Sequence, residues 1–222
     1  MPFLFVDYDQ GAGGEKFCAE LSQSDQCEKL TYETYSNGRT KIHDVYSQEF
    51  LKPHPEIIDI KQSHPVLYTI VPTHQHTDLA KSLLKDVYSI RIQMPKDPVI
   101  YSRVVEHRIN KVLLTREPTQ EYFFGLLKIL VELTNNRDFV KKVKYNMTTI
   151  EIMLLSQGQE PTPAAIEQYL NNLRSKKYPE PNQQYDLIIP YEQLVSEPDQ
   201  VYAKLNSTFG ITVVGNWLST YA

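Results

Sequence analysis

The sequence predicts an α/β fold built on a parallel β-sheet, with more helix than strand by residue count. The first observation is a short apolar run, 3–7, which leads through a glycine-rich turn into a helical stretch at about 14–23. The second is the continuous apolar run 66–71, which is typical of a strand buried on both faces. Strand 87–92 follows it, and the alternation of strands with helical patterns favours parallel pairing.

The rest of the chain is dominated by helical periodicity. Between about 98 and 178, apolar residues recur at intervals of three and four, which predicts a helical expansion inside a single domain of residues 1–222. The polar segment 24–41 contains a predicted turn at 36–38. The other expected helices are 43–51, 77–85, 104–113, 123–130, 137–145, 148–157, 164–177 and 197–208, and the last expected strand is 186–189.

Composition excludes several classes of partner. Hydrophobic residues make up 41% and charged residues 23% of the 222 residues, close to globular averages. The net charge is −4 with both signs interspersed, so we expect neither nucleic acid nor an anionic membrane as a partner. No apolar run approaches the roughly 20 residues of a membrane span. The first residues lack the basic region of a signal peptide, so an intracellular location is expected.

The glycine-rich turn after the first strand has the layout of a phosphate site. A strand, a turn containing Gly11, Gly13 and Gly14, and then a helix together aim backbone N–H groups and a helix N-terminus at one point. This P-loop-like arrangement predicts an anion cradle at the end of the first strand.

Four segments, in chain order, resemble the cytosolic-type sulfotransferases. These enzymes transfer a sulfuryl group from 3′-phosphoadenosine 5′-phosphosulfate (PAPS) to an acceptor hydroxyl. The segments are the loop 11–15, Pro72-Thr73-His74, the stretch 93–102 with its Pro95-Lys96-Asp97 core, and 189–194 followed by Glu197-Pro198 and 209–211. The resemblance implies a sulfotransferase-like fold.

The resemblance also implies roles for individual residues. Gly11, Gly13, Gly14 and Lys16 would bind the 5′-phosphosulfate, and His74 would be the catalytic base, a role that suits imidazole near neutral pH. An equally good interpretation of His74 is a hydrogen-bonded histidine at a strand end. The residues implied around the 3′-phosphate are Lys96, Ser102 and Arg103.

At three positions the cation expected from the family is replaced. Gly11 stands in place of the loop lysine, Pro72 in place of the lysine before the histidine, and Gln93 in place of the 3′-phosphate arginine. Glutamine cannot supply a charge-assisted bidentate contact to phosphate. Because each lost stabilising donor costs roughly 100- to 1000-fold in rate, the leading hypothesis is a non-catalytic protein with no cofactor. A PAPS-dependent sulfotransferase is the alternative, and nucleotide binding without transfer is a third.

Tyrosine content suggests what a non-catalytic chain would do. The chain has 15 tyrosines, a residue that protein interfaces favour. In size and composition it resembles the occlusion-body proteins of insect viruses, and the polyhedrin of nudiviruses in particular. This resemblance implies self-assembly into a crystalline lattice inside the host cell, with Tyr32, Tyr35 and Tyr178 as candidate contacts.

The two cysteines, Cys18 and Cys27, leave two interpretations open. They are either reduced thiols or members of a disulfide crosslink, within one chain or between chains. No zinc-type spacing is present, so no metal site is expected.

Overall fold

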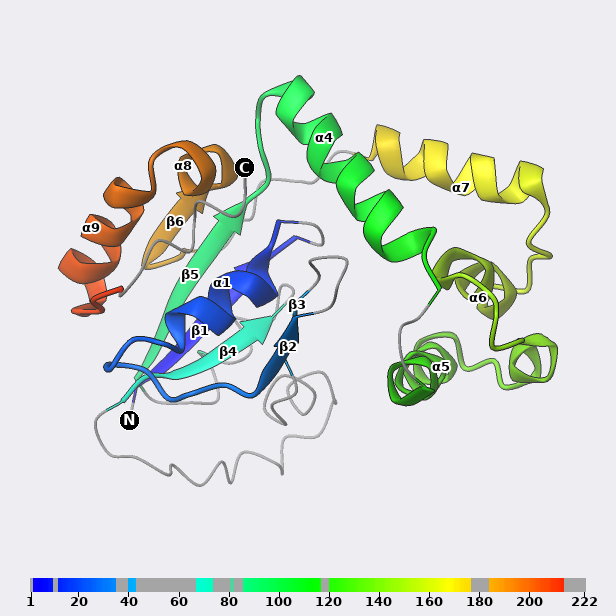
Figure 1. The fold of residues 1–222 in the computed structure, drawn as a ribbon, viewed down its shortest axis with the longest axis horizontal. Coiled ribbons are helices and arrows are strands. Elements are labelled where there is room, and N and C mark those ends of the chain that lie inside the picture. The colour runs from blue at the N-terminus through cyan, green and yellow to red at the C-terminus, as the bar shows by residue number, and fades with distance from the viewer. Residues whose placement is uncertain are drawn as a thin grey trace. The chain divides into compact units, whose positions relative to one another are not determined.

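The structure, a computed structural model, is drawn in Figure 1 and describes residues 2–9, 12–34, 40–42, 67–73, 81, 86–116, 120–176 and 184–213. It divides into two compact units. The first unit is Met1–Tyr101 together with Tyr178–Ala222, and the second is Ser102–Lys177. Each unit is described by itself below.

A four-stranded parallel sheet forms the centre of the first unit, which confirms the expected α/β character (Figure 1). Its strands are β1 (Phe3–Tyr8), β4 (Thr69–Thr73), β5 (Val87–Gln93) and β6 (Leu187–Pro190). The strand order is β4-β1-β5-β6, and all three pairings are parallel. All six residues of β1 are buried, as expected for a central strand.

Helices α1 (Gly14–Leu21) and α9 (Pro198–Phe209) pack on the same face of this sheet. Gly14 lies against the ring of Tyr8, and the ring of Phe209 is 6.1 Å from the ring of Tyr88. Tyr88 pairs with Leu4, four residues before Tyr8, so both tyrosines point to that face. Helix α9 ends at Gly210, whose φ of 68° is the left-handed conformation that glycine adopts easily.

Three elements of the first unit are not predicted by the sequence pattern. Strands β2 (Tyr32–Thr34) and β3 (Thr40–Ile42) form an antiparallel pair within the segment expected to be polar loop. The short helix α8 (Tyr191–Ser196) directly follows β6. The turn predicted at 36–38 and the helix at 43–51 lie outside the described residues, as does the helix at 77–85 apart from Lys81.

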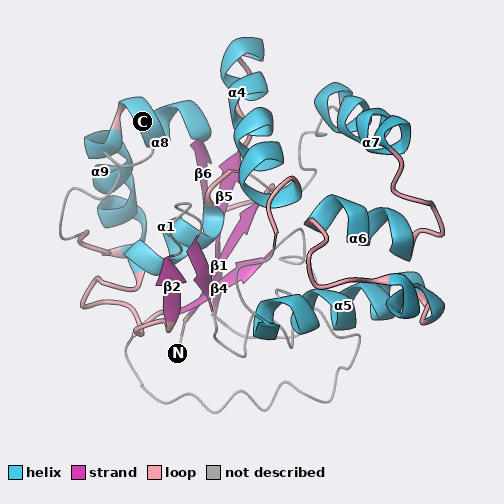
Figure 2. Ribbon diagram, turned by 45° about the vertical axis from the view of Figure 1, so that its right-hand side comes forward, coloured by secondary structure: helices cyan, strands magenta, loops and turns pink. Residues whose placement is uncertain are grey.

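The second unit is helical and covers nearly the same residues as the expected expansion (Figure 2). Its elements are α4 (Pro98–Arg108, which begins in the first unit), a π-helical turn η2 (Ile109–Leu113), α5 (Gln120–Thr134), a 3-10 helix η3 (Asp138–Lys142), α6 (Thr149–Ser156) and α7 (Pro163–Ser175). Helix α6 lies at the centre of the unit, in contact with η2, α5, η3 and α7.

Local sequence explains where these helices begin. Thr148 and Glu151 form a capping box at the start of α6, in which the Thr148 N–H donates to Glu151 Oε2 at 2.7 Å. Thr162 accepts from the Ala165 N–H at the start of α7, and Pro163 occupies the first helical position. The core of the unit consists of Phe123, Leu127, Leu130, Phe139, Ile152 and Leu155. None of the helices in the described ranges has the length and apolarity needed to cross a membrane.

Candidate functional site

The carboxyl ends of the four parallel strands meet at one edge of the sheet. From β1 the chain passes to β4 on one side, and β5 then lies on the other side of β1. In open α/β sheets, ligands bind outside the carboxyl ends of the strands at such a switch point. The described parts of the four segments that resemble sulfotransferases lie at or directly after the carboxyl ends of β1, β4, β5 and β6, so the fold brings them to this edge. The exceptions are 197–198 and 209–211, which flank α9, and the ring of Phe209 packs on Tyr88 near the start of β5.

The glycine turn after β1 requires glycine at two positions. Gly13 has a φ of 71°, in the left-handed region that side chains disfavour. A Cβ on Gly14 would lie 2.0 Å from Cγ of Tyr8, so α1 packs against β1 more closely than any side chain allows. The Ala12 N–H donates to the Asp9 carbonyl at 3.0 Å, which closes the turn. These two positions explain why the turn contains Gly13 and Gly14, and the anion cradle itself stays a prediction.

A buried ion-pair cluster, which we call the strand-edge triad, lies beside this turn. It consists of Asp7, Asp9 and Arg91, whose exposed fractions are 0%, 5% and 2%. Arg91 Nη1 is 3.3 Å from Asp7 Oδ1, and Arg91 Nη2 is 2.5 Å from Asp9 Oδ2. Tyr185 donates its hydroxyl to the second Asp7 oxygen. Buried charges are tolerated only when they are paired and hydrogen-bonded, and the triad meets this requirement.

Within the described residues, the triad carries more negative than positive formal charge. Two carboxylates and one guanidinium carry a formal net charge of −1, where a phosphate site needs cations. Arg91 Nε and Thr73 Oγ1 are buried and have no hydrogen-bond partner in the part of the chain that the structure describes. Both residues pair with Asp7 in the sheet register, so they share one row with it. Two buried polar atoms of this row are therefore without a hydrogen-bond partner among the described residues, beside a cluster of net negative formal charge.

A second internal carboxylate occupies the segment after β5. Glu192, at the start of α8, accepts hydrogen bonds from the Lys96 N–H at 2.7 Å and the Asp97 N–H at 3.4 Å. Asp97 in turn accepts from the Val99 and Ile100 N–H groups and so caps α4. The resemblance to sulfotransferases implies a 3′-phosphate site at this segment. Its backbone N–H groups instead bind a carboxylate of the protein itself.

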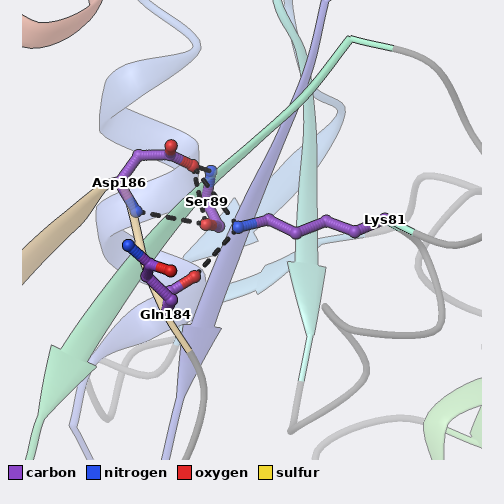
Figure 3. Close-up of polar contacts among 4 residues, drawn as sticks. All are labelled: Lys81, Ser89, Gln184 and Asp186. Atoms are coloured by element: carbon purple, nitrogen blue, oxygen red, sulfur yellow. Dashed lines mark hydrogen bonds and ion pairs between the residues drawn. The ribbon is translucent and has the colours of Figure 1, made fainter.

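Asp186, directly before β6, bonds to Ser89 of β5 (Figure 3). Asp186 Oδ2 accepts from the Ser89 N–H at 2.7 Å and from the Ser89 hydroxyl at 2.8 Å. Lys81 Nζ is 3.7 Å from the same carboxylate oxygen and donates to the Gln184 carbonyl at 3.0 Å. Because Asp186 directly follows Tyr185, these contacts position the tyrosine that reaches the strand-edge triad.

The remaining predicted site residues are distributed over both units. Lys16 is half-buried on α1, and burial lowers the pKa of its ammonium while the nearby Glu20 partly opposes this. Lys96 is exposed in the loop after β5. Ser102 and Arg103 are exposed residues of α4 and belong to the second unit. Gly11 and His74 lie outside the described residues.

The predicted assembly and crosslink residues have different surroundings. Cys18 and Cys27 are both buried free thiols. Burial raises the pKa of Cys18 well above its ordinary value and that of Cys27 to about 12, so both stay protonated at neutral pH. A buried thiol does not reach a neighbouring molecule, which leaves the crosslink between copies unsupported. Tyr32 is half-buried, and Tyr35 and Tyr178 lie outside the described residues.

No model of a protein family, no curated protein and no solved structure matches this chain. The resemblance to sulfotransferases therefore rests on four short segments alone, and the resemblance to occlusion-body proteins on size and composition.

Proposed function

We propose that this chain is a non-catalytic structural protein that assembles with copies of itself into a dense lattice, as a viral occlusion-body protein does inside a host cell. Its fold is a sulfotransferase-like α/β fold that has lost its donor site. The observation that carries this proposal is the strand-edge triad, in which a buried cation near the glycine turn is paired with two carboxylates of the same chain.

Electrostatics explain why the triad opposes PAPS. The donor carries several negative charges, and the approach to Arg91 would place them beside Asp7 and Asp9 in a region of low dielectric. Like charges in such an environment repel strongly, so an anion would have to displace a carboxylate from the guanidinium. Glu192 creates the same conflict at the loop after β5. The proposal is therefore supported by a carboxylate that binds the loop after β5 and by the negative formal charge of the triad beside the glycine turn.

Composition supports the assembly part of the proposal. A chain with 15 tyrosines has the residue type that provides large contact areas with a polar tip. In this function the partner is a second copy of the chain, and no cofactor is involved.

Titration calorimetry with adenosine 3′,5′-bisphosphate tests the loss of the donor site. We expect no binding to the wild-type protein at about 1 mM, the upper end of typical KM values. The matched variant, Asp7→Asn with Asp9→Asn, leaves Arg91 without its negative partners, and we expect it to bind the bisphosphate measurably. Micromolar binding by the wild type would overturn the proposal.

Static light scattering over a range of protein concentrations tests assembly. We expect the mass to rise with concentration at neutral pH. A protein that stays monomeric up to its solubility limit would contradict a lattice function.

One observation favours the alternative, a PAPS-dependent sulfotransferase acting on a hydroxyl. The close packing of Gly14 on Tyr8 and the left-handed Gly13 preserve the shape of a phosphate loop. In this alternative, Gly13, Gly14 and Lys16 would bind the 5′-phosphosulfate. Bisphosphate binding by the wild type together with sulfuryl transfer to a phenol would support it.

A further inference from the structure

The second unit presents apolar side chains to solvent along one side of α5. Gly125, Ile129 and Leu133, here called the α5 row, follow one another at intervals of four and therefore line up along the helix. Ile129 is 49% and Leu133 is 76% exposed, whereas Phe123 and Leu127 on the other side of the helix belong to the core. The row is exposed although its chemistry favours burial.

Gly125 has no role inside its own chain that explains it. It lies in the middle of a 15-residue helix, where glycine costs roughly 0.5–1 kcal/mol relative to alanine. A Cβ added at this position would meet nothing within 4 Å. Among the residues that the structure describes, no neighbour therefore requires the absence of a side chain at Gly125. It does allow a second helix to approach α5 closely at this point.

The charged residues beside the α5 row can form ion pairs with the same residues of a second copy. Lys128 and Glu132 are exposed next to the row, and neither forms an ion pair within the described residues. In a contact with two-fold symmetry, residue i of one copy faces residue j of the other, and j faces i. If two α5 helices pack antiparallel about Ile129, the small Gly125 of each copy faces Leu133 of the other. In the same arrangement Lys128 of each copy lies near Glu132 of the other.

We propose that the α5 row is a contact surface between two copies of this chain, which pack their α5 helices antiparallel about a two-fold axis. The proposal rests on the proposed self-assembly and adds to it one specific contact. A helix of 15 residues is about 22 Å long, so the contact is smaller than a standard interface of about 800 Å² per partner. It is therefore a weak contact, of the kind that becomes effective when each molecule in an assembly makes several contacts at once.

Charge exchange tests this contact. In the Lys128→Glu variant, positions 128 and 132 are both glutamate, so glutamates of the two copies face each other. In the Glu132→Lys variant, both positions are lysine, so lysines of the two copies face each other. Sedimentation velocity at several concentrations should show that each variant alone self-associates about tenfold more weakly than the wild type, because like charges then face each other. An equimolar mixture of the two variants should recover association, because every glutamate now faces a lysine.

The control is Lys144→Glu, which changes the net charge of the same unit by the same amount as Lys128→Glu, at an exposed position outside the α5 row. It should associate as the wild type does. A folding defect in either variant would persist in the mixture. Recovery of association in the mixture would therefore show that the facing charges weaken each variant alone. Wild-type association of both single variants, or a mixture no stronger than either of them, would overturn this contact while leaving self-assembly intact. A wild type that stays monomeric would overturn both proposals, and bisphosphate binding by that monomer would point to the sulfotransferase alternative.

Discussion

At the scale of single residues, Arg91 decides the character of the sheet edge. Its guanidinium is fully buried in a central strand and bonds to Asp7 and Asp9, which the chain supplies from β1 and the residue after it. A guanidinium in this position would be the natural partner of a phosphate. Because two carboxylates already bind the guanidinium, Arg91 instead holds β1 and β5 together.

Replacement of Arg91 should therefore be severe. In an Arg91→Met variant, Asp7 and Asp9 stay buried without their cation, and breaking a buried pair in this way costs about 3–5 kcal/mol. Urea unfolding followed by circular dichroism measures the loss in the free energy of unfolding. The control is the triple variant that adds Asp7→Asn and Asp9→Asn, which removes the stranded charges and should recover most of the stability. Equal stability of Arg91→Met and the wild type would mean that the triad does not form.

The strand-edge triad was partly predictable from the sequence. Asp7 and Arg91 interrupt strands that are otherwise largely apolar, and a charge in a buried strand needs a partner. That signal indicates a pair, but it does not say which residues join it. The register of β1 against β5 places Asp7 beside Arg91, and Tyr185 reaches Asp7 from 178 positions away in the chain. Such long-range pairings depend on the strand order, which local patterns do not contain.

At the scale of secondary-structure elements, the contact between α1 and β1 depends on the absence of one methyl group. Gly14→Ala would place a Cβ 2.0 Å from the Tyr8 ring, and neither element can move without disturbing the sheet. We expect a loss of about 1–3 kcal/mol, as for other overpacked positions, seen as a lower urea midpoint. The matched control is Gly125→Ala on α5, where the new methyl meets nothing within the chain and should raise stability by about 0.5–1 kcal/mol. Similar effects at the two glycines would contradict this account of Gly14.

Elements with clear periodicity or strong end signals were predictable, and the others were not. Strands β1 and β5 follow their apolar runs, and Pro163 marks the start of α7. The β2–β3 pair has polar residues in strands of three residues, too short for an alternating pattern to stand out. Helix α8 has six residues and begins directly after a strand, so it has no room for a helical repeat of its own.

At the scale of the whole molecule, several buried acids make the fold sensitive to alkali. Burial raises the pKa of Tyr191, and burial with the nearby Tyr88 and Cys27 raises the pKa of Tyr68. The thiols of Cys18 and Cys27 shift in the same direction. A group whose pKa is higher in the folded state stabilises the fold fully below its unfolded pKa and loses this effect as the pH rises through the folded value.

The free energy of unfolding should therefore be nearly constant between about pH 7 and 8 and should fall between about pH 9 and 12, where unfolded cysteines and tyrosines ionise first. Urea unfolding at a series of pH values measures this slope. A Tyr191→Phe variant removes one titrating group, so its slope should be shallower than that of the wild type. Identical slopes for the two proteins would show that Tyr191 does not contribute.

The discontinuous first unit has a consequence for biosynthesis. Residues of β6 leave the ribosome only after the entire second unit, Ser102–Lys177, has been made. Until then β5 is the outer strand of a three-stranded sheet, with Ser89 lacking Asp186 and Asp7 lacking Tyr185. Its open backbone groups can pair with any other strand during this interval. The nascent polypeptide is therefore most vulnerable to misassembly along β5, and the arrival of 184–190 ends that period.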